Sequence, residues 1–283
     1  MTVNLRRRRV TVNGVSVCAA EAGHGGTPTV FLHGGGPGCT ALSDFGPVLD
    51  AVRVGRHLVL LDLPQYGDSD APPITGPVFD FHTAALAGAL GALGVRRADF
   101  VCQSLGGSVA LLLAARRPDL VRRIVVTGCQ PVPPPTGVSV DTGLARQLRA
   151  SYYGGSGPTP QRMRALMAAA EWSDASAIPE KTVQSRYAAS TTPGARALGL
   201  AHELRGAAQD LSPALAQVAA PVQLIWGEHD PFAGPDYARA LADRLAQAKV
   251  AVLPRTAHHP QAERPAHYAE LVQQFLTTEQ GVA

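Results

Sequence analysis

The sequence predicts an α/β fold in which helices flank a mostly parallel sheet. Short apolar runs alternate along the chain with segments of helical periodicity, which is the pattern of repeated βαβ units. Hydrophobic residues make up 46% of the 283 residues and charged residues 17%, so the chain can bury a sizeable core. This length fits one large α/β domain, or a core that carries an insertion.

The sheet is predicted to begin with an antiparallel hairpin. Segments 5–12 and 15–21 flank Asn13-Gly14, and an Asn-Gly pair between two alternating strands is the strongest short-range hairpin signal. The first segment contains four consecutive arginines, residues 6–9. We interpret them as a solvated strand face, with a phosphate or partner contact as the alternative.

Six more strands and four helices complete the predicted core. The strands are short, rich in Val, Leu or Ile, and end in polar or glycine-rich residues, as buried parallel strands do. They are predicted at 29–33, 57–62, 98–103, 121–127, 221–226 and 249–253. The helices are predicted at 79–93, 105–117, 235–247 and 266–276.

The run from 129 to 220 interrupts this alternation. It begins with a proline-rich stretch, contains no convincing strand, and has helix-like pieces near 143–151, 160–171, 179–189 and 194–205. A block of this kind between two sheet strands predicts an inserted helical cap. We therefore expect a core made of residues 1–129 and 220–283 and a cap at 130–219.

Composition and cysteine spacing exclude several classes of protein. The net charge of +3 is too balanced for a nucleic-acid-binding protein, and no stretch of 18 apolar residues indicates a membrane span. The N-terminus lacks the order of a signal peptide. The four cysteines form no CxxC pair, which argues against a zinc site and a disulfide framework. We expect a cytoplasmic protein without nucleic-acid or membrane partners.

The segment around Ser104 is the first candidate for chemistry. Cys102-Gln103-Ser104-Leu105-Gly106 joins a predicted strand to a predicted helix. A serine on such a sharp turn is exposed above the sheet edge, and small residues two positions before and after it relieve crowding. Gly106 fits this pattern, whereas Cys102 stands where glycine is usual. The alternative is an ordinary helix N-terminus capped by Ser104.

Three other strand ends carry residues that fit the same chemistry. The glycine run at 33–38, His-Gly-Gly-Gly-Pro-Gly, allows backbone N–H groups to face a ligand. Asp230 follows the strand at 221–226, and His258-His259 follows the last strand. The chain order Ser104, Asp230, His258 is that of the nucleophile-elbow hydrolases. Open α/β sheets place their sites at the carboxyl ends of strands, where all four features lie.

With these motifs the sequence resembles the α/β-hydrolase superfamily, and more narrowly the meta-cleavage product hydrolases, which cleave a carbon–carbon bond in ring-opened aromatic compounds. The resemblance covers nearly the whole chain. It rests on the glycine run, on Asp-Leu-Pro-Gln-Tyr-Gly-Asp-Ser at 62–69, on the cap segment 180–190 and on His258-x-x-Gln261-x-Glu263. It implies an α/β-hydrolase fold with a mostly parallel eight-stranded sheet and a helical cap. It also implies a small-molecule substrate, no metal or organic cofactor, and a possible homodimer.

The catalytic roles follow from the chemistry that a hydrolase needs. A serine hydroxyl is too weak an acid to react unaided, so Ser104 needs a base to act as nucleophile, or else orients an attacking water. His258 is the candidate base, and its neighbour His259 is the rival. Asp230 is expected to orient the imidazole and to stabilise it when protonated.

The same pattern predicts the groups around the substrate. The backbone N–H groups of Gly35 and Leu105 are expected to form the oxyanion hole. In the family that the sequence resembles, a cap arginine grips the substrate carboxylate, and Arg186 matches that arginine; a surface arginine is the alternative. A planar guanidinium suits a carboxylate. The other predicted substrate-binding residues, three of which replace the residues usual in that family, are Gly34, Gly36, Gln103, Asp44 and His259.

Three functions are compatible with these residues. The leading one is a cofactor-independent hydrolase that cleaves a carbon–carbon bond of a vinylogous diketo acid. The second is an esterase, lactonase or thioesterase that acts on a small or polyketide-like acid. The third, from another class, is a ligand-binding module that has lost turnover. The intact set of Ser104, Asp230 and His258 argues against the third.

Overall fold

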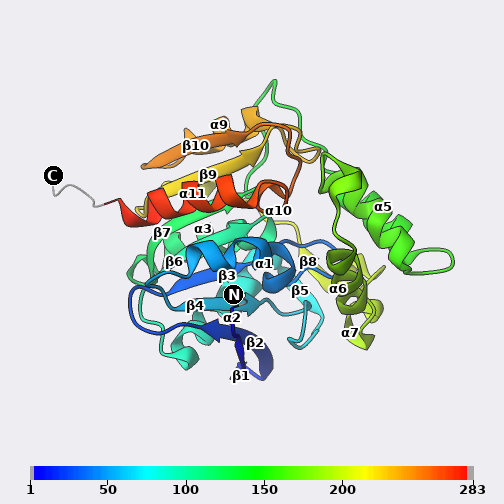
Figure 1. Ribbon diagram of the computed structural model, residues 1–283, viewed down its shortest axis with the longest axis horizontal. Coiled ribbons are helices and arrows are strands. Elements are labelled where there is room, and N and C mark those ends of the chain that lie inside the picture. The colour runs from blue at the N-terminus through cyan, green and yellow to red at the C-terminus, as the bar shows by residue number, and fades with distance from the viewer. Residues whose placement is uncertain (1–2, 279–283) are drawn as a thin grey trace.

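The computed structural model describes residues 3–278 and has an eight-stranded sheet at its centre (Figure 1). The strands of this sheet are β1 (Arg6–Val12), β2 (Val15–Ala22), β3 (Thr29–Leu32), β4 (Leu58–Asp62), β6 (Ala98–Gln103), β7 (Val121–Thr127), β9 (Val222–Gly227) and β10 (Ala248–Leu253). Their spatial order is β1-β2-β4-β3-β6-β7-β9-β10. The β1–β2 and β2–β4 pairs are antiparallel and the other pairs are parallel, which confirms the predicted fold class.

The N-terminal hairpin turns where the sequence predicts it. Asn13 and Gly14 both have positive φ, 50° and 81°, as a tight two-residue hairpin turn requires. The arginine run lies on β1, where Arg7 pairs with Asp68, and Arg8 with a buried carboxylate of β2 at 3.2 Å. These contacts agree with the interpretation of the run as a strand face.

Helices cover both faces of the sheet. One face carries α1 (Ala41–Val52) and α11 (Pro265–Thr277), which Figure 1 shows in front of the strands. The opposite face carries α2 (Val78–Leu93), α3 (Leu105–Arg116), α8 (Ser212–Leu215) and α9 (Pro235–Ala242). Successive residues of β9 show why both faces need cover: Ile225 packs in the first layer and Trp226 in the second, and both are fully buried.

Two helices of the core differ from the prediction, and in the cap the helix-like piece predicted at 194–205 is a helix only as far as Ala197. The sequence analysis missed α1, which begins at a capping box between Thr40 and Ser43 but contains Gly46 and Pro47, residues that lower helix propensity. Helix α9 ends at Ala242, whereas the pattern predicted 247. In both core helices the local sequence pattern is ambiguous, so tertiary packing and capping decide whether the helix forms and where it ends.

The cap lies between β7 and β9 and consists mainly of four helices, α4 (Leu144–Tyr153), α5 (Pro160–Ala170), α6 (Glu180–Ser190) and α7 (Pro193–Ala197). Figure 1 shows α5, α6 and α7 together beyond one end of the sheet. The cap has a small apolar cluster of its own, which includes Tyr152 and Trp172. These aromatic rings therefore pack inside the cap. The cap limits at 130 and 219 stay a prediction.

A second sheet of two strands corrects one expectation. The run from 129 to 220 does contain a strand, β8 (Arg205–Ala207), which pairs in parallel with β5 (Ile74–Pro77). Three residues are too few to give a periodic signal. The pair fastens the end of the cap segment to the core.

The remaining short elements are α10 (Pro260–Glu263) and three single turns of 3₁₀ helix, η1 (Pro118–Leu120), η2 (Ala175–Ala177) and η3 (His202–Leu204). No helix between residues 3 and 278 is both long enough and apolar enough to cross a lipid bilayer. Over the same residues, no three His, Cys, Asp or Glu side chains gather as metal ligands would.

Candidate active site

Ser104 lies on a sharp turn between the end of β6 and the start of α3. Its φ of 46° and ψ of −111° are strained for a residue other than glycine. Two backbone hydrogen bonds hold the turn: Ser104 N–H donates to Thr127 O at 2.7 Å, and Gly106 N–H donates to His33 O at 3.1 Å. The Ser104 side chain makes no capping hydrogen bond, so the ordinary N-cap interpretation is wrong.

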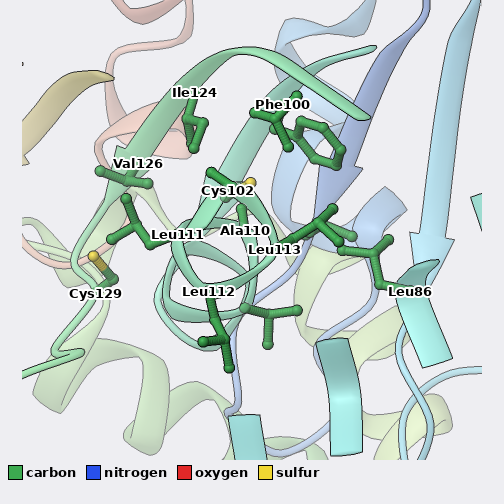
Figure 2. Packing of buried hydrophobic residues seen from close by; sticks show 14 of the residues in the cluster. Leu86, Phe100, Cys102, Ala110, Leu111, Leu112, Leu113, Ile124, Val126 and Cys129 are labelled. Atoms are coloured by element: carbon green, nitrogen blue, oxygen red, sulfur yellow. The ribbon is translucent and has the colours of Figure 1, made fainter. Parts of the chain in front are cut away.

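The residues on either side of Ser104 fit tightly against the core. A Cβ atom on Gly106 would lie 2.5 Å from the carbonyl oxygen of Leu32, so only glycine fits there. Cys102 is fully buried among apolar side chains between β6 and α3 (Figure 2). Burial raises the pKa of its thiol well above the usual value, so the thiol stays protonated and unreactive.

His258 and Asp230 form a buried pair. The imidazole Nδ1 lies 2.7 Å from Asp230 Oδ2, and the other carboxylate oxygen accepts the N–H of Phe232 at 3.0 Å. Burial alone would lower the pKa of His258, but the Asp230 charge and hydrogen bond outweigh it and raise the pKa above its ordinary value. Because Nδ1 faces Asp230, Nε2 is the nitrogen left to exchange a proton with a substrate or a nucleophile.

The sequence analysis missed Gly128, which directly follows β7 and supports this imidazole. A Cβ atom on Gly128 would lie 2.5 Å from Cε1 of His258 and 3.3 Å from Oδ2 of Asp230. Its φ of 61° also favours glycine. The one available signal was a glycine at the carboxyl end of a predicted strand, a position at which sites form in this type of sheet.

His259, the rival base, has a different partner. Its Nδ1 lies 3.9 Å from Glu171 Oε2, and its backbone N–H donates to Glu171 O at 3.1 Å. Burial is the main reason why its pKa is lowered, which favours a neutral ring. Gln103 donates from Nε2 to His258 O at 2.8 Å, so this predicted substrate-binding residue holds the histidine loop.

The glycine run forms a loop that side chains on both sides keep in place. His33 Nε2 accepts the N–H of Leu63 at 2.9 Å, and Asp44 Oδ2 accepts the N–H of Gly34 at 2.8 Å. The Cβ position of Gly35 lies 3.5 Å from Leu105 Cβ, so the two residues whose amides are predicted to form the oxyanion hole are in contact. Neither N–H donates a hydrogen bond to any acceptor in the part of the chain that the structure describes.

A cavity of about 180 Å³ lies between the cap helices and the strand ends. Ser104 and His258 both line it, as do three glycines of the glycine run. The predicted residues in its wall are Gly34, Gly35, Gly36, Ser104, His258 and His259. Four other predicted residues support the wall from behind without lining it: Gln103, Asp44, Leu105 and Asp230.

Arg186 also lies behind the wall, and each of the three nitrogens of its guanidinium donates a hydrogen bond. It donates from Nη1 and Nη2 to the two carboxylate oxygens of Glu171 at 2.9 and 2.8 Å, and from Nε to Pro37 O at 3.0 Å. Burial alone would raise the pKa of Glu171, but Arg186 and His259 hold it at about 2, so the carboxylate is charged. Arg186 is therefore not the surface arginine of the alternative interpretation, because it is buried in an ion pair with Glu171. Its predicted contact with a substrate carboxylate stays untested.

Arg149, on α4, is the arginine that lines the cavity, and the sequence analysis did not single it out. Its Nη2 donates to Gly35 O at 2.7 Å. Between residues 3 and 278, no carboxylate lies within ion-pair distance of it. Burial, with nearby Arg205, lowers its pKa, because a desolvated cation lacks a counter-charge there. Helical periodicity alone cannot indicate that one cap arginine faces a cavity.

Fold and geometry together define a hydrolase of the nucleophile-elbow type, and the comparison with protein families agrees. The family model for the alpha/beta hydrolase fold matches residues 28–265, so the chain belongs to this family. Its curated relatives narrow the class. A 2-hydroxy-6-oxononadienedioate/2-hydroxy-6-oxononatrienedioate hydrolase from Burkholderia vietnamiensis is 29% identical over 267 residues, which cover 90% of this chain and 89% of the relative.

A second relative acts on a smaller compound. A 2-hydroxymuconate semialdehyde hydrolase from a Pseudomonas species is 29% identical over 276 residues, which are 95% of this chain and 93% of that one. Among solved structures, the 2-hydroxy-6-oxo-6-phenylhexa-2,4-dienoate hydrolase from Rhodococcus superposes with a TM-score of 0.84 at 23% identity, over 98% of this chain and 100% of that one. At that identity the likeness establishes the fold.

Proposed function

We propose that this hydrolase cleaves the carbon–carbon bond of a small 2-hydroxy-6-oxo-dienoate, a vinylogous diketo acid. The observation that carries the proposal is that Ser104 and the Asp230-paired His258 line one small cavity whose wall also contains Arg149, which has no carboxylate partner in residues 3–278. The curated relatives act on compounds of this type, as their names state.

The chemistry assigns a step to each group. His258 first helps to move a proton along the dienol, which gives the ketone, because a carbanion is otherwise a poor leaving group. Ser104 Oγ then bonds to the C6 carbonyl carbon while His258 takes its proton. The C5–C6 bond breaks, its electron pair enters the dienolate, and a proton completes that product. Water then hydrolyses the acyl-serine ester to a carboxylic acid, so one water is consumed overall.

The oxyanion formed at C6 needs donors that are already in place. The N–H groups of Gly35 and Leu105 supply them, and loss of one such donor typically costs about 3 kcal/mol of transition-state stabilisation. In the alternative form of the mechanism, Ser104 orients a water that attacks C6 directly. Both forms use the same base and the same oxyanion site.

For the carboxylate at C1, Arg149 is a better anchor than Arg186. Arg186 already satisfies the charge of Glu171, whereas Arg149 lines the cavity with one of its five N–H groups on Gly35 O. A substrate carboxylate would give this half-buried cation the counter-charge that it lacks among residues 3–278. The size of the cavity favours a small acyl group, since about 180 Å³ is below the roughly 300 Å³ of the smallest drug-sized pockets.

A panel of substrates tests the proposal. The panel contains 2-hydroxymuconate semialdehyde, its 6-methyl and 6-phenyl ketone analogues, a lactone and 4-nitrophenyl acetate. We expect loss of the dienol absorbance with the aldehyde and the methyl ketone, release of the matching acid by mass spectrometry, and kcat/KM at least about 10-fold lower for the phenyl ketone. Ser104→Ala should abolish turnover. Hydrolysis of the ester or lactone without any dienoate cleavage would reject the proposal in favour of the esterase or lactonase alternative.

Two expectations go with this proposal. A cytoplasmic location and a homodimer both stay predictions. Gel filtration with light scattering checks the dimer, which the resemblance to the meta-cleavage product hydrolases implies.

A further inference from the structure

Arginine side chains of the cap hold the glycine loop (residues 33–38) by donating hydrogen bonds to carbonyl oxygens of the loop. Arg149 donates to Gly35 O at 2.7 Å, and Arg186 donates to Pro37 O at 3.0 Å. The loop also approaches the cap backbone, since a Cβ atom on Gly38 would lie 1.9 Å from Arg186 O. Two cap helices, α4 and α6, thus fix the loop that bears the predicted oxyanion amide.

A third cap arginine reaches the same carbonyl through Tyr66. The Tyr66 hydroxyl donates to Gly35 O at 3.1 Å, and Arg205 Nη2 donates to the Tyr66 hydroxyl oxygen at 2.6 Å. The Arg205 guanidinium also lies over the Tyr66 ring, 5.4 Å from its centroid. Arg205 is the first residue of β8, where it pairs with Ile74 of β5 and so has a fixed position.

Tyr66 itself is held firmly on the core side. It is buried, and its ring lies 4.8 Å from the ring of His33, whose nitrogen accepts the Leu63 N–H. Neither Tyr66 nor Arg205 lines the cavity that Ser104 and His258 share. Their contacts therefore act on the loop and leave direct substrate binding untouched.

The orientation of this carbonyl matters because glycine gives the backbone little resistance to rotation. Gly35 O and the Gly35 N–H belong to the two peptide groups that flank one Cα atom. If the peptide after Gly35 turned over, its oxygen would leave its two donors and disturb the neighbouring amide. Preorganised donors are what makes an oxyanion site effective, since they need no reorganisation during the reaction.

We propose that Tyr66 and Arg205 are positioning residues through which the cap keeps the oxyanion loop in its reactive conformation. The inference rests on the role given to Gly35 in the proposed function. It makes the last segment of the cap part of the machinery for transition-state stabilisation, in addition to its role as a cover over the cavity.

The test uses the whole chain with Tyr66→Phe and Arg205→Met, a neutral ester (4-nitrophenyl acetate) and an alkyl boronic acid as a tetrahedral inhibitor. We expect kcat to fall about 10-fold in each variant with KM unchanged within about twofold. The inhibition constant of the boronic acid should rise by the same factor as kcat falls. Arg205→Lys should recover part of the loss, because lysine can still donate to the hydroxyl oxygen.

Arg146→Met is the matched control, since Arg146 is an exposed arginine on α4 that donates no hydrogen bond to the loop among residues 3–278. It should leave kcat and the inhibition constant unchanged. Tyr66→Phe removes only the hydroxyl and keeps the aromatic ring, so it tests the inference even if Arg205→Met does not fold. Unchanged kcat and inhibition constant in folded Tyr66→Phe would overturn the inference, as would a rise in KM alone. Failure of the proposed carbon–carbon cleavage appears separately, as wild-type protein that hydrolyses the ester but not the dienoates.

Discussion

The core and the cap contribute to the active site in different ways. Core residues are placed mainly by the backbone: Ser104 by its strained turn, and His258 by contact with Gly128 together with its hydrogen bond to Asp230. Cap residues are placed by charge: Arg186 is fixed by Glu171, while Arg149 has no carboxylate partner in residues 3–278. We therefore expect the reaction chemistry to depend on the sheet edge, and the choice of substrate to depend on which cap charges are already neutralised.

The largest expected effect is on the core side, in Asp230→Asn. We expect kcat to fall about 10⁴-fold with KM little changed, because the imidazole loses the carboxylate that orients and stabilises it. The pH profile supplies a second readout. His258 must be neutral to act as base and Asp230 raises its pKa, so the acidic limb of kcat/KM should lie above pH 6.5 in the wild type and move to lower pH in the variant.

A variant with normal folding and near-normal kcat would show that the carboxylate is dispensable. An acidic limb that stays in place would show that His258 is not the group that titrates. His259→Ala is the control, because its ring contacts Glu171 in place of Asp230 and should leave the position of the limb unchanged.

The next effect is on the cap side, in Glu171→Gln. It leaves Arg186 buried without a counter-charge, and we expect the free energy of unfolding in urea to fall by about 3–5 kcal/mol. The double variant Glu171→Leu with Arg186→Met removes both charges and should recover most of that loss. If the single and double variants lose equal stability, then this pair stabilises the protein mainly by packing and not by its charges.

The smallest effect separates Arg149 from Arg186 as the anchor for the substrate. Arg149→Met should lower kcat/KM about 100-fold for a dienoate, since removal of the cation that pairs with the substrate carboxylate inside the cavity costs a few kcal/mol. For 4-nitrophenyl acetate the loss should not exceed about 10-fold, because Tyr66 still holds Gly35 O. Arg146→Met again serves as the control. Equal losses on the two substrates would assign Arg149 to the loop alone.

The sequence allowed prediction of the parts that repeat a regular pattern. Buried parallel strands and the hairpin at Asn13-Gly14 follow from periodicity within short windows. The order of Ser104, Asp230 and His258 follows from motifs at strand ends that lie far apart in the chain. Such features depend on residues near one another in the chain, or on strand ends that the fold brings to one edge of the sheet.

The features that were missed depend on contacts across the chain. Glu171 is 15 positions from Arg186, and nothing in either local pattern indicates that they pair. Gly128 is needed because a histidine 130 positions later packs on it. The direction of Arg149 depends on how α4 is set over the sheet, which a helical pattern in a mostly polar cap cannot determine.

The turn at Ser104 tolerates change on one side only. After the serine, a side chain at 106 would collide with a main-chain oxygen that cannot move, so this position is limited to glycine. Before the serine, position 102 lies mainly among apolar side chains, which can adapt to one another, and here they accept a sulfur atom that also meets the backbone of Leu32. A motif search that demands glycine at both places would overlook enzymes built like this one, whereas a search that fixes only the second would find them.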